Sequence, residues 1–396
     1  MDNVNSISFD DTAVAFASKS DKELRKMYLL FASMNNNFLV SSGTAALKLG
    51  LRLRLPIKSL IKKTVFEHFC GGESIRDSEE TIQELAKYNI GTILDYSVEG
   101  EKAESGFDKT AGEIIKTIEK AKESSNIPFS VFKVTGLASG EILEKAQKGT
   151  LNAEEKGRYD KIVERIDKIC KKACDYKVRI FIDGEESWMQ DAIDEIVYSM
   201  MQKYNVESPI VYNTYQMYRK DMLGKLKTAF QYAATYNYYL GAKLVRGAYM
   251  EKERERAEDE GYEDPIQPDK AATDEDYNRA LKFCLDNKQR VALCSGSHNE
   301  YSNYYLTVLM EKHGLKNDDQ RIYFAQLYGM SDNISFNLAK AGYNVAKYVP
   351  YGPVEAVMPY LFRRAEENTS IAGQSSREFL LIKKELQRRK AARKLE

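Results

Sequence analysis

The chain has 396 residues, of which 43% are hydrophobic and 30% are charged, a composition typical of a folded protein with a sizeable core. Its 59 basic and 59 acidic residues give a formal net charge of zero, which argues against a protein that coats nucleic acid through basic excess. Five cysteines do not suit a disulfide framework, and no run of about 18 apolar residues occurs, so we expect a reducing compartment and no transmembrane helix.

Residues 1–88 are predicted to form a helical arm. The N-terminus begins with several aspartates and no early basic residue, which is neither a signal peptide nor a transit peptide. Ser20 and Asp21 are suitable N-cap residues for a first amphipathic helix. A later helix is expected from about Ser78 to Lys87, directly before the first predicted strand.

A basic stretch at 45–66 lies inside this arm. No acidic residue occurs between Glu23 and Glu67, and apolar and basic residues alternate irregularly through the stretch. A surface that contacts anionic lipid would have this pattern. Helices packed on a domain, with solvated Lys and Arg head groups, would have it too, and the sequence favours this simpler interpretation without excluding the first.

From residue 90 onward, short apolar runs alternate with charged segments of helical period. There are eight such runs, at 91–100, 129–136, 178–186, 210–216, 242–249, 290–299, 321–329 and 344–352. Each is rich in apolar or β-branched residues, as expected of a strand buried on both faces. Eight strand–helix units over about 290 residues predict an α/β fold, a (β/α)8 TIM barrel occupying 89–396. The alternative, an open doubly wound sheet, is weakened because neither GxGxxG nor GxxxxGK[ST] occurs.

Polar residues lie in or just after every one of these runs, where a barrel carries its active site. Buried polar groups are costly unless they are paired or line a cavity, so a set that converges on one mouth favours a functional site. The set is Asp95, Glu99, Lys133, Asp183, Asn213, Gln216, Arg246, Tyr249, Ser297, His298, Asn299, Gln326, Tyr348 and Tyr351.

Lys133 and Asp183 occupy matching places on neighbouring strands. They are expected to form an ion pair that either shapes a substrate pocket or simply holds two strands together, because a buried Lys requires a carboxylate partner in both cases. Arg363 and Arg364 fall on a helix after the eighth run, and Glu367 lies four residues after Arg363, within reach on the same face. A guanidinium pair suits a carboxylate, although this feature alone favours a solvated pair on an outer barrel helix.

Histidine is too scarce for a histidine-based zinc site, so no metal is expected. The chain holds three histidines, of which His298 ends a buried strand. His68 and His313 are expected at the surface or in loops.

Four segments, at 240–257, 296–299, 324–336 and 347–368, resemble proline dehydrogenase in sequence and in order. The resemblance covers roughly 90–390 and is closest to the single-function form, with no fused aldehyde dehydrogenase expected. It implies a distorted (β/α)8 barrel with non-covalent FAD. It also implies oxidation of L-proline to Δ1-pyrroline-5-carboxylate by hydride transfer to flavin N5. This is the first step from proline to glutamate, with electrons passed to a membrane quinone.

The resemblance also assigns residues to the substrate. Arg363 and Arg364 match the pair that binds the proline carboxylate, and Lys133 matches the residue that closes that pocket. The remaining residues match an acidic neighbour, an apolar wall, a ring contact and a carboxylate near the flavin, in that order: Asp183, Leu327, Tyr348 and Glu367.

Positions that match the family's FAD contacts come mainly from the fourth, fifth, sixth and seventh runs. They are Asn213, Gln216, Lys243, Val245, Arg246, Gly247, Ala248, Tyr249, Ser297, His298, Asn299 and Gln326. Many bacterial members carry Arg where this chain has Lys243 beside the flavin. A Lys can still donate there, but as a point charge without the planar fork.

Three other functions remain open at this stage. A hydroxyproline dehydrogenase is the nearest, although the bulk of Tyr348 argues against it. A flavin-free lyase or aldolase could use Lys133 as a Schiff base, and a membrane or nucleic-acid scaffold could use the basic stretch. We expect a cytoplasmic protein, or a peripheral one on the inner membrane face (the matrix side of a mitochondrion in a eukaryote), with contact through 45–66.

Overall fold

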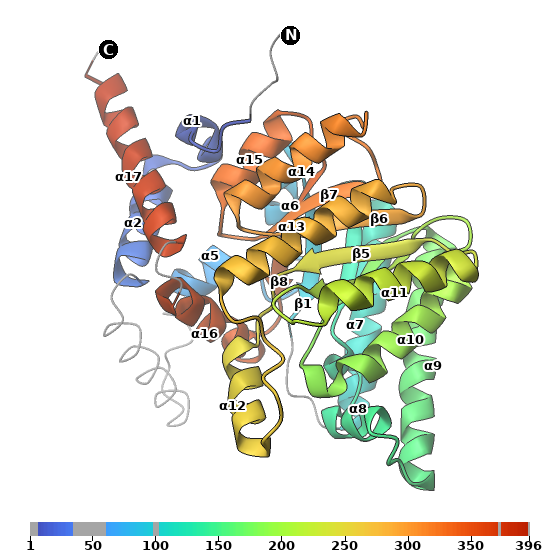
Figure 1. Cartoon of the computed structure of the whole chain (residues 1–396). Coiled ribbons are helices and arrows are strands. Elements are labelled where there is room, and N and C mark those ends of the chain that lie inside the picture. The colour runs from blue at the N-terminus through green and yellow to red at the C-terminus, as the bar shows by residue number, and fades with distance from the viewer. Residues whose placement is uncertain (1–6, 35–60, 98–102, 371–373, 395–396) are drawn as a thin grey trace.

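The computed structural model describes residues 7–34, 61–97, 103–370 and 374–394, and at 63, 365–370 and 374–376 it describes the backbone alone. Its centre is a closed barrel of eight parallel strands that neighbour one another in chain order (Figure 1). The strands are β1 (Ile90–Tyr96), β2 (Phe129–Phe132), β3 (Arg179–Ile182), β4 (Val211–Gln216), β5 (Leu240–Val245), β6 (Val291–Gly296), β7 (Ile322–Leu327) and β8 (Val345–Tyr351). Each overlaps one of the predicted runs, so the predicted (β/α)8 barrel is confirmed.

Helices surround the barrel and connect its strands (Figure 1). The described α-helices are α1 (Thr12–Ala15), α2 (Asp21–Met34), α5 (Glu67–Phe69), α6 (Glu79–Ala86), α7 (Glu104–Glu123), α8 (Gly140–Gln147), α9 (Ala153–Tyr176), α10 (Ser187–Tyr204), α11 (Met222–Thr235), α12 (Met250–Glu260), α13 (Lys270–Asp286), α14 (Glu300–Lys312), α15 (Asp332–Lys340), α16 (Val354–Ser370) and α17 (Gln374–Ala392). The predicted N-cap region before α2 and the helix expected near Ser78 are both present. Within the described segments, no helix combines the length and apolar character needed to cross a membrane.

Aromatic rings fill the barrel interior. Side chains along a strand alternate between the interior and the surrounding helices. The inward positions of the strands supply Phe129, Phe181, Tyr212 and Tyr323 to one buried cluster. The rings of Phe129 and Phe181 stack with centroids 4.2 Å apart. Because these rings close the interior, polar groups with the same inward orientation can gather only toward the ends of the strands.

Helices α2 and α17 lie side by side next to the barrel (Figure 1). Phe31 of α2 and Leu381 and Ile382 of α17 belong to one buried cluster. The rings of Tyr28 and Phe379 stack across the same contact with centroids 4.8 Å apart. The division of the chain at residue 88 stays a prediction. The interpretation of the basic stretch concerns mainly 45–60, which lies outside the described residues.

His68 is not the surface or loop residue that the sequence suggested. It lies in α5, packs edge-on against Phe31 and Phe69, and donates from Nε2 to the carbonyl of Gly329 at 2.9 Å. Burial lowers its pKa to about 4. The prediction was wrong because helix α2, distant in the sequence, covers this side chain.

Glu378 joins α17 to the loop before α15. The side chain is buried, and its carboxylate accepts the N–H of Ser331. Burial raises the pKa of Glu378 to about 7, and the charge of Asp332 adds to the effect. The folded chain therefore holds this proton more tightly than the unfolded chain. The stabilising contribution is complete below about pH 4.5 and is lost as the pH rises toward 7.

We expect Glu378→Gln to lose less stability with rising pH than the parent protein. The raised pKa of Glu378 corresponds to about 3 kcal/mol of unfolding free energy lost between pH 4.5 and 7. A glutamine has no ionisable group, so this pH dependence disappears, while its amide oxygen still accepts the Ser331 N–H. Denaturant unfolding at pH 5 and pH 8 measures the difference. The exposed Glu154→Gln serves as the control, and equal pH slopes for the two variants would show that Glu378 is not the source.

Candidate active site

Three polar side chains meet inside the barrel at the carboxyl ends of β3, β5 and β8. The ammonium of Lys243 contacts the carboxylate of Asp183 and donates to the hydroxyl of Tyr348 at 2.8 Å. That hydroxyl donates to Oδ1 of Asp183 at 3.1 Å. All three occupy inward positions of their strands or the strand extension, so the barrel itself brings them together. Lys243 is 4% exposed and Tyr348 is 9% exposed, so this group is shielded from water.

Lys133 lies beside this group between two carboxylates. Its Nζ is 3.7 Å from Oδ2 of Asp183 and 3.6 Å from Oδ2 of Asp95. The predicted ion pair between Lys133 and Asp183 is therefore present, while its role toward a substrate stays a prediction. Asp95 was noted only as a strand-end residue. Its buried, inward position on β1, where the hydroxyl of Ser97 donates to it at 2.6 Å, adds it to the group.

The charges of this group fix the protonation of its members. Burial by itself would raise the pKa of Asp183, but the charges of Lys243 and Lys133 outweigh it and hold that pKa below its ordinary value. Burial raises the pKa of Tyr348 well above 10, and the Asp183 carboxylate raises it further. At neutral pH Asp183 is ionised and Tyr348 is neutral, so the phenol acts as a hydrogen-bond donor.

Helix α16 brings arginine to the same end of the barrel. Arg364 is 6% exposed, and its guanidinium lies 5.2 Å from the centre of the Tyr360 ring. Arg363, its neighbour, is half-buried. Leu327, at the end of β7, packs against both the apolar face of α16 and the barrel interior. Leu327 therefore lies between α16 and Tyr348. The side chain of Glu367 lies outside the described residues.

The loop after β5 offers backbone groups at the rim. Gly247 has φ of +130°, and a Cβ there would stand 2.4 Å from the ring of Tyr218, so only glycine fits. The N–H of Tyr218 donates to the carbonyl of Arg246 at 2.7 Å and holds the loop against β4. Gly247 and Ala248 are exposed, whereas Val245 and Tyr249 are partly buried. Exposed backbone amides in such a loop suit an anionic group.

Arg246 supports this rim from behind. Its Nε lies 2.7 Å from the carboxylate of Asp274, and its other nitrogens donate to Ser297 at 2.7 Å and Ser302 at 3.0 Å. Asn299 is the N-cap of α14 and accepts the N–H of Ser302 at 2.9 Å. The side chain of Arg246 thus ties the β5 loop to the β6 loop, and the side chain of Asn299 caps the helix that follows the β6 loop.

His298 lies where these loops approach α16. Its Nδ1 is 2.8 Å from the hydroxyl of Ser331, and its Nε2 accepts the N–H of Leu327 at 3.4 Å. Burial lowers the pKa of His298 to about 3, and the charges of Lys347 and Arg364 lower it further. His298 is therefore a neutral imidazole at the edge of the site.

Two predicted cofactor residues do not face the mouth. Asn213 occupies an outward position of β4, and its amide donates to Asp194 of α10 at 2.9 Å. Gln326 occupies an outward position of β7, donates to the carbonyl of Ser297 at 3.0 Å and accepts from Ser335 at 2.8 Å. The prediction that their side chains join the others is corrected, because alternate strand residues point to opposite faces.

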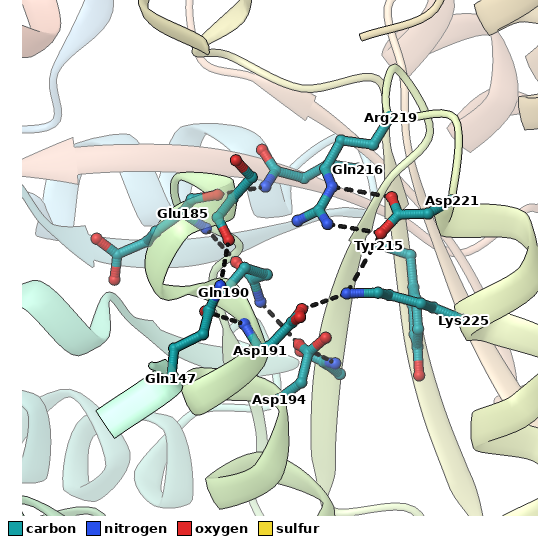
Figure 2. A network of polar contacts seen from close by, with 12 residues as sticks. Gln147, Glu185, Gln190, Asp191, Asp194, Tyr215, Gln216, Arg219, Asp221 and Lys225 are labelled. Carbon is teal, nitrogen blue, oxygen red and sulfur yellow. Dashed lines mark hydrogen bonds and ion pairs between the residues drawn. The ribbon is translucent and has the colours of Figure 1, made fainter. Parts of the chain in front are cut away.

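Gln216 has the inward orientation that Asn213 lacks. Its amide donates to the carbonyl of Glu185 at 2.7 Å, and Figure 2 shows this contact within a larger polar network. The loop after β3 is thereby tied to the end of β4. Gln216 therefore lies at the mouth with one donor already used by the protein.

Comparison with known proteins gives a consistent result. The model of a family described as proline dehydrogenase matches residues 78–377. Proline dehydrogenase 1, mitochondrial, of Dictyostelium discoideum is 35% identical over 96% of this chain and 74% of its own length. The human protein of that name is 42% identical over 64% of this chain and 44% of its own length. Hydroxyproline dehydrogenase of Xenopus laevis is 31% identical over 97% of this chain and 90% of its own length.

A solved structure gives the same fold. Proline utilization A from Bdellovibrio bacteriovorus superposes with a TM-score of 0.72 at 20% identity, over 91% of this chain and 38% of that chain. At this identity the likeness concerns the fold alone. The chain thus spans less than half of this structure and of the human relative.

Proposed function

Because this chain belongs to the proline dehydrogenase family, we propose that it oxidises L-proline to Δ1-pyrroline-5-carboxylate with bound FAD. The reaction takes a hydride from the ring carbon next to nitrogen and a proton from nitrogen, so a C=N bond forms. It is the first step in the conversion of proline to glutamate. The main support for this proposal is the polar group inside the barrel mouth, in which Lys243 and Tyr348 are buried and Lys133 and Asp183 are partly buried.

The proposed substrate contacts follow from this group. Arg363 and Arg364 bind the proline carboxylate through guanidinium groups, and Lys133 closes the same pocket. The ring of Tyr348, stacked on Phe181 with centroids 6.3 Å apart, and the side chain of Leu327 pack against the ring carbons. The cations also disfavour the ammonium form of proline, so its nitrogen lone pair is available for oxidation. Glu367 is proposed near the Arg pair and the flavin.

The residues at the rim fit an FAD molecule. The exposed amides of Gly247 and Ala248, in a loop that excludes a Cβ, suit its pyrophosphate, and Gln216, Ser297 and His298 border the same loops. Lys243, Val245 and Tyr249 would adjoin the ring system, with Arg246 and Asn299 shaping the rim. When bound, FAD supplies the hydride acceptor at N5, and the protein supplies orientation and charge.

An absorbance spectrum tests the cofactor and the substrate together. We expect purified protein to show flavin bands that bleach when L-proline is added without an external acceptor. Colourless protein that forms a borohydride-trapped adduct through Lys133 would instead indicate a flavin-free lyase or aldolase.

A hydroxyproline dehydrogenase is the second candidate, because one relative bears that name. Tyr348 argues against it, since its ring is held by Phe181 and its hydroxyl by Asp183 and Lys243. A substituent on the proline ring would meet this fixed phenol.

We expect Tyr348→Ser to accept 4-hydroxyproline better relative to proline, because removing the ring opens space beside the substrate. Steady-state kinetics with both substrates gives the ratio of kcat/KM values. Tyr323→Phe, deeper in the same interior cluster, is the control and should leave that ratio unchanged. An unchanged ratio in Tyr348→Ser would remove this residue from the ring contact.

Electrons are proposed to pass from the flavin to a membrane quinone. Two relatives are named mitochondrial proteins, and a matrix-side location at the inner membrane is proposed by analogy for a eukaryotic protein. Contact with that membrane through the basic stretch at 45–66 is part of the same proposal.

A further inference from the structure

A second cavity lies away from the barrel mouth. It has a volume of about 350 Å³ and is bordered by residues from α8, the start of α10 and the end of α12. None of the residues proposed above for proline or FAD lines it. Its volume is within the range of small-molecule sites.

Two arginines at this cavity retain donors without acceptors. Arg219 is 4% exposed, and two of its nitrogens bind the carboxylate of Asp221 at 3.0 and 2.7 Å (Figure 2). Its Nη1 has no hydrogen-bond partner among the described residues, and the same holds for Nε of Arg256. A buried N–H without an acceptor costs about 1–3 kcal/mol, so a ligand that supplied an acceptor to either arginine would be stabilised.

Charges of both signs border the cavity, three cations and two carboxylates. Lys148, Arg219 and Arg256 border it, together with the carboxylates of Asp191 and Glu260. The two carboxylates belong to side chains that are 50% exposed, so each can contact a ligand beyond its pairing with Lys225 or Arg256. Such a lining does not favour a multiply charged anion. It suits a zwitterion, which brings one group of each sign.

The rest of the lining is aromatic or apolar. Trp188 borders the cavity, and the Arg256 guanidinium lies 4.3 Å from its ring centre. Tyr262 and Pro265 also border it. Pro265 is held by its carbonyl, which accepts the N–H of Lys220 at 2.9 Å. A ligand with an apolar body beside its charged end would cover these surfaces.

We propose that this cavity binds a free α-amino acid with an apolar or aromatic side chain. The carboxylate meets Arg219 and Arg256, the ammonium meets Asp191 and Glu260, and the side chain packs on Trp188 and Tyr262. This binding site is separate from the proposed proline site and does not depend on the proposed reaction.

The chain itself supplies the reporter for a test. Trp188 is the single tryptophan of the sequence, so all tryptophan fluorescence arises from a side chain at this cavity. L-Phenylalanine is titrated into the FAD-loaded protein. 3-Phenylpropanoate and phenethylamine, which lack the ammonium and the carboxylate respectively, are titrated in parallel. We expect saturable change with L-phenylalanine and about tenfold weaker binding of each analogue, because each loses one charge-assisted contact.

Variants separate this cavity from other sites. Arg256→Gln and Glu260→Gln should each weaken L-phenylalanine binding about tenfold, whereas Arg279→Gln, on the exposed face of α13, should leave it unchanged. Titration of Arg364→Met with L-phenylalanine shows whether the fluorescence change arises from binding in the proline pocket. A retained change in this variant supports binding in the second cavity. The proposal is overturned by an absent or non-saturable signal, by equal binding of either analogue, or by loss of the signal only in Arg364→Met.

Discussion

Replacing Arg364 with methionine is expected to raise KM for proline about 10- to 150-fold while the FAD content of the purified protein stays unchanged. A hydrogen bond to a charged group contributes about 1.5–3 kcal/mol, which corresponds to this range. Arg364 is buried and lies over Tyr360, so its guanidinium is held in place before substrate arrives. Methionine keeps the apolar length of the side chain and removes only the charge and its donors.

The control is Arg279→Met, an exposed arginine on α13 that pairs with Glu275. It should leave KM and FAD content unchanged. Steady-state kinetics and the flavin-to-protein absorbance ratio measure both quantities. Unaltered proline kinetics in Arg364→Met would remove the residue from the carboxylate site, and loss of FAD at unaltered KM would place it at the cofactor instead.

The barrel was predictable because its strands are continuous apolar runs, and eight alternations of such a run with a helical segment are found in few folds. The polar residues were selected because they lie near the strand ends, without considering which face of the strand each side chain occupies. Asn213 and Gln216 lie three residues apart on β4, so they face opposite sides, and only Gln216 faces the interior. The same alternation separates Gln326, which faces α15, from Leu327, which faces the mouth. Assigning alternate residues of each run to opposite faces of the strand would have separated these residues from the sequence alone.

Other features depend on contacts that no local pattern encodes. The sequence placed Asp95 at the mouth, but its approach to Lys133 arises because the closed barrel places β1 beside β2. The burial of His68 depends on α2, and the packing of α17 on α2 joins the two ends of the chain. These contacts arise from tertiary packing between segments that are far apart in the sequence.

Asp183→Asn is expected to be the most damaging single substitution at the mouth. Lys243 has a side chain that is 5% exposed, and among the described residues it would keep the neutral amide oxygen and the hydroxyl of Tyr348 but lose its charged partner. Removing one member of a buried ion pair costs about 3–5 kcal/mol, because the remaining charge stays in a medium of low polarity. The Tyr348 phenol also loses its charged acceptor and with it the contact that fixes its ring. We expect kcat/KM for proline to fall about 100-fold or more, since small displacements of positioning groups have effects of this size.

A substitution in a comparable buried ion pair outside the barrel interior separates an effect on stability from an effect on catalysis. Lys347, on the outward side of β8, is fully buried and pairs with Asp332 at 2.8 Å. Asp332→Asn should therefore lower the unfolding free energy by a similar amount while affecting kcat/KM much less. Denaturant unfolding and proline kinetics on both variants make the comparison. Equal losses of kcat/KM would mean that Asp183 acts only through stability, whereas a loss confined to Asp183→Asn would follow from its contacts with Lys133, Lys243 and Tyr348 at the proposed proline site.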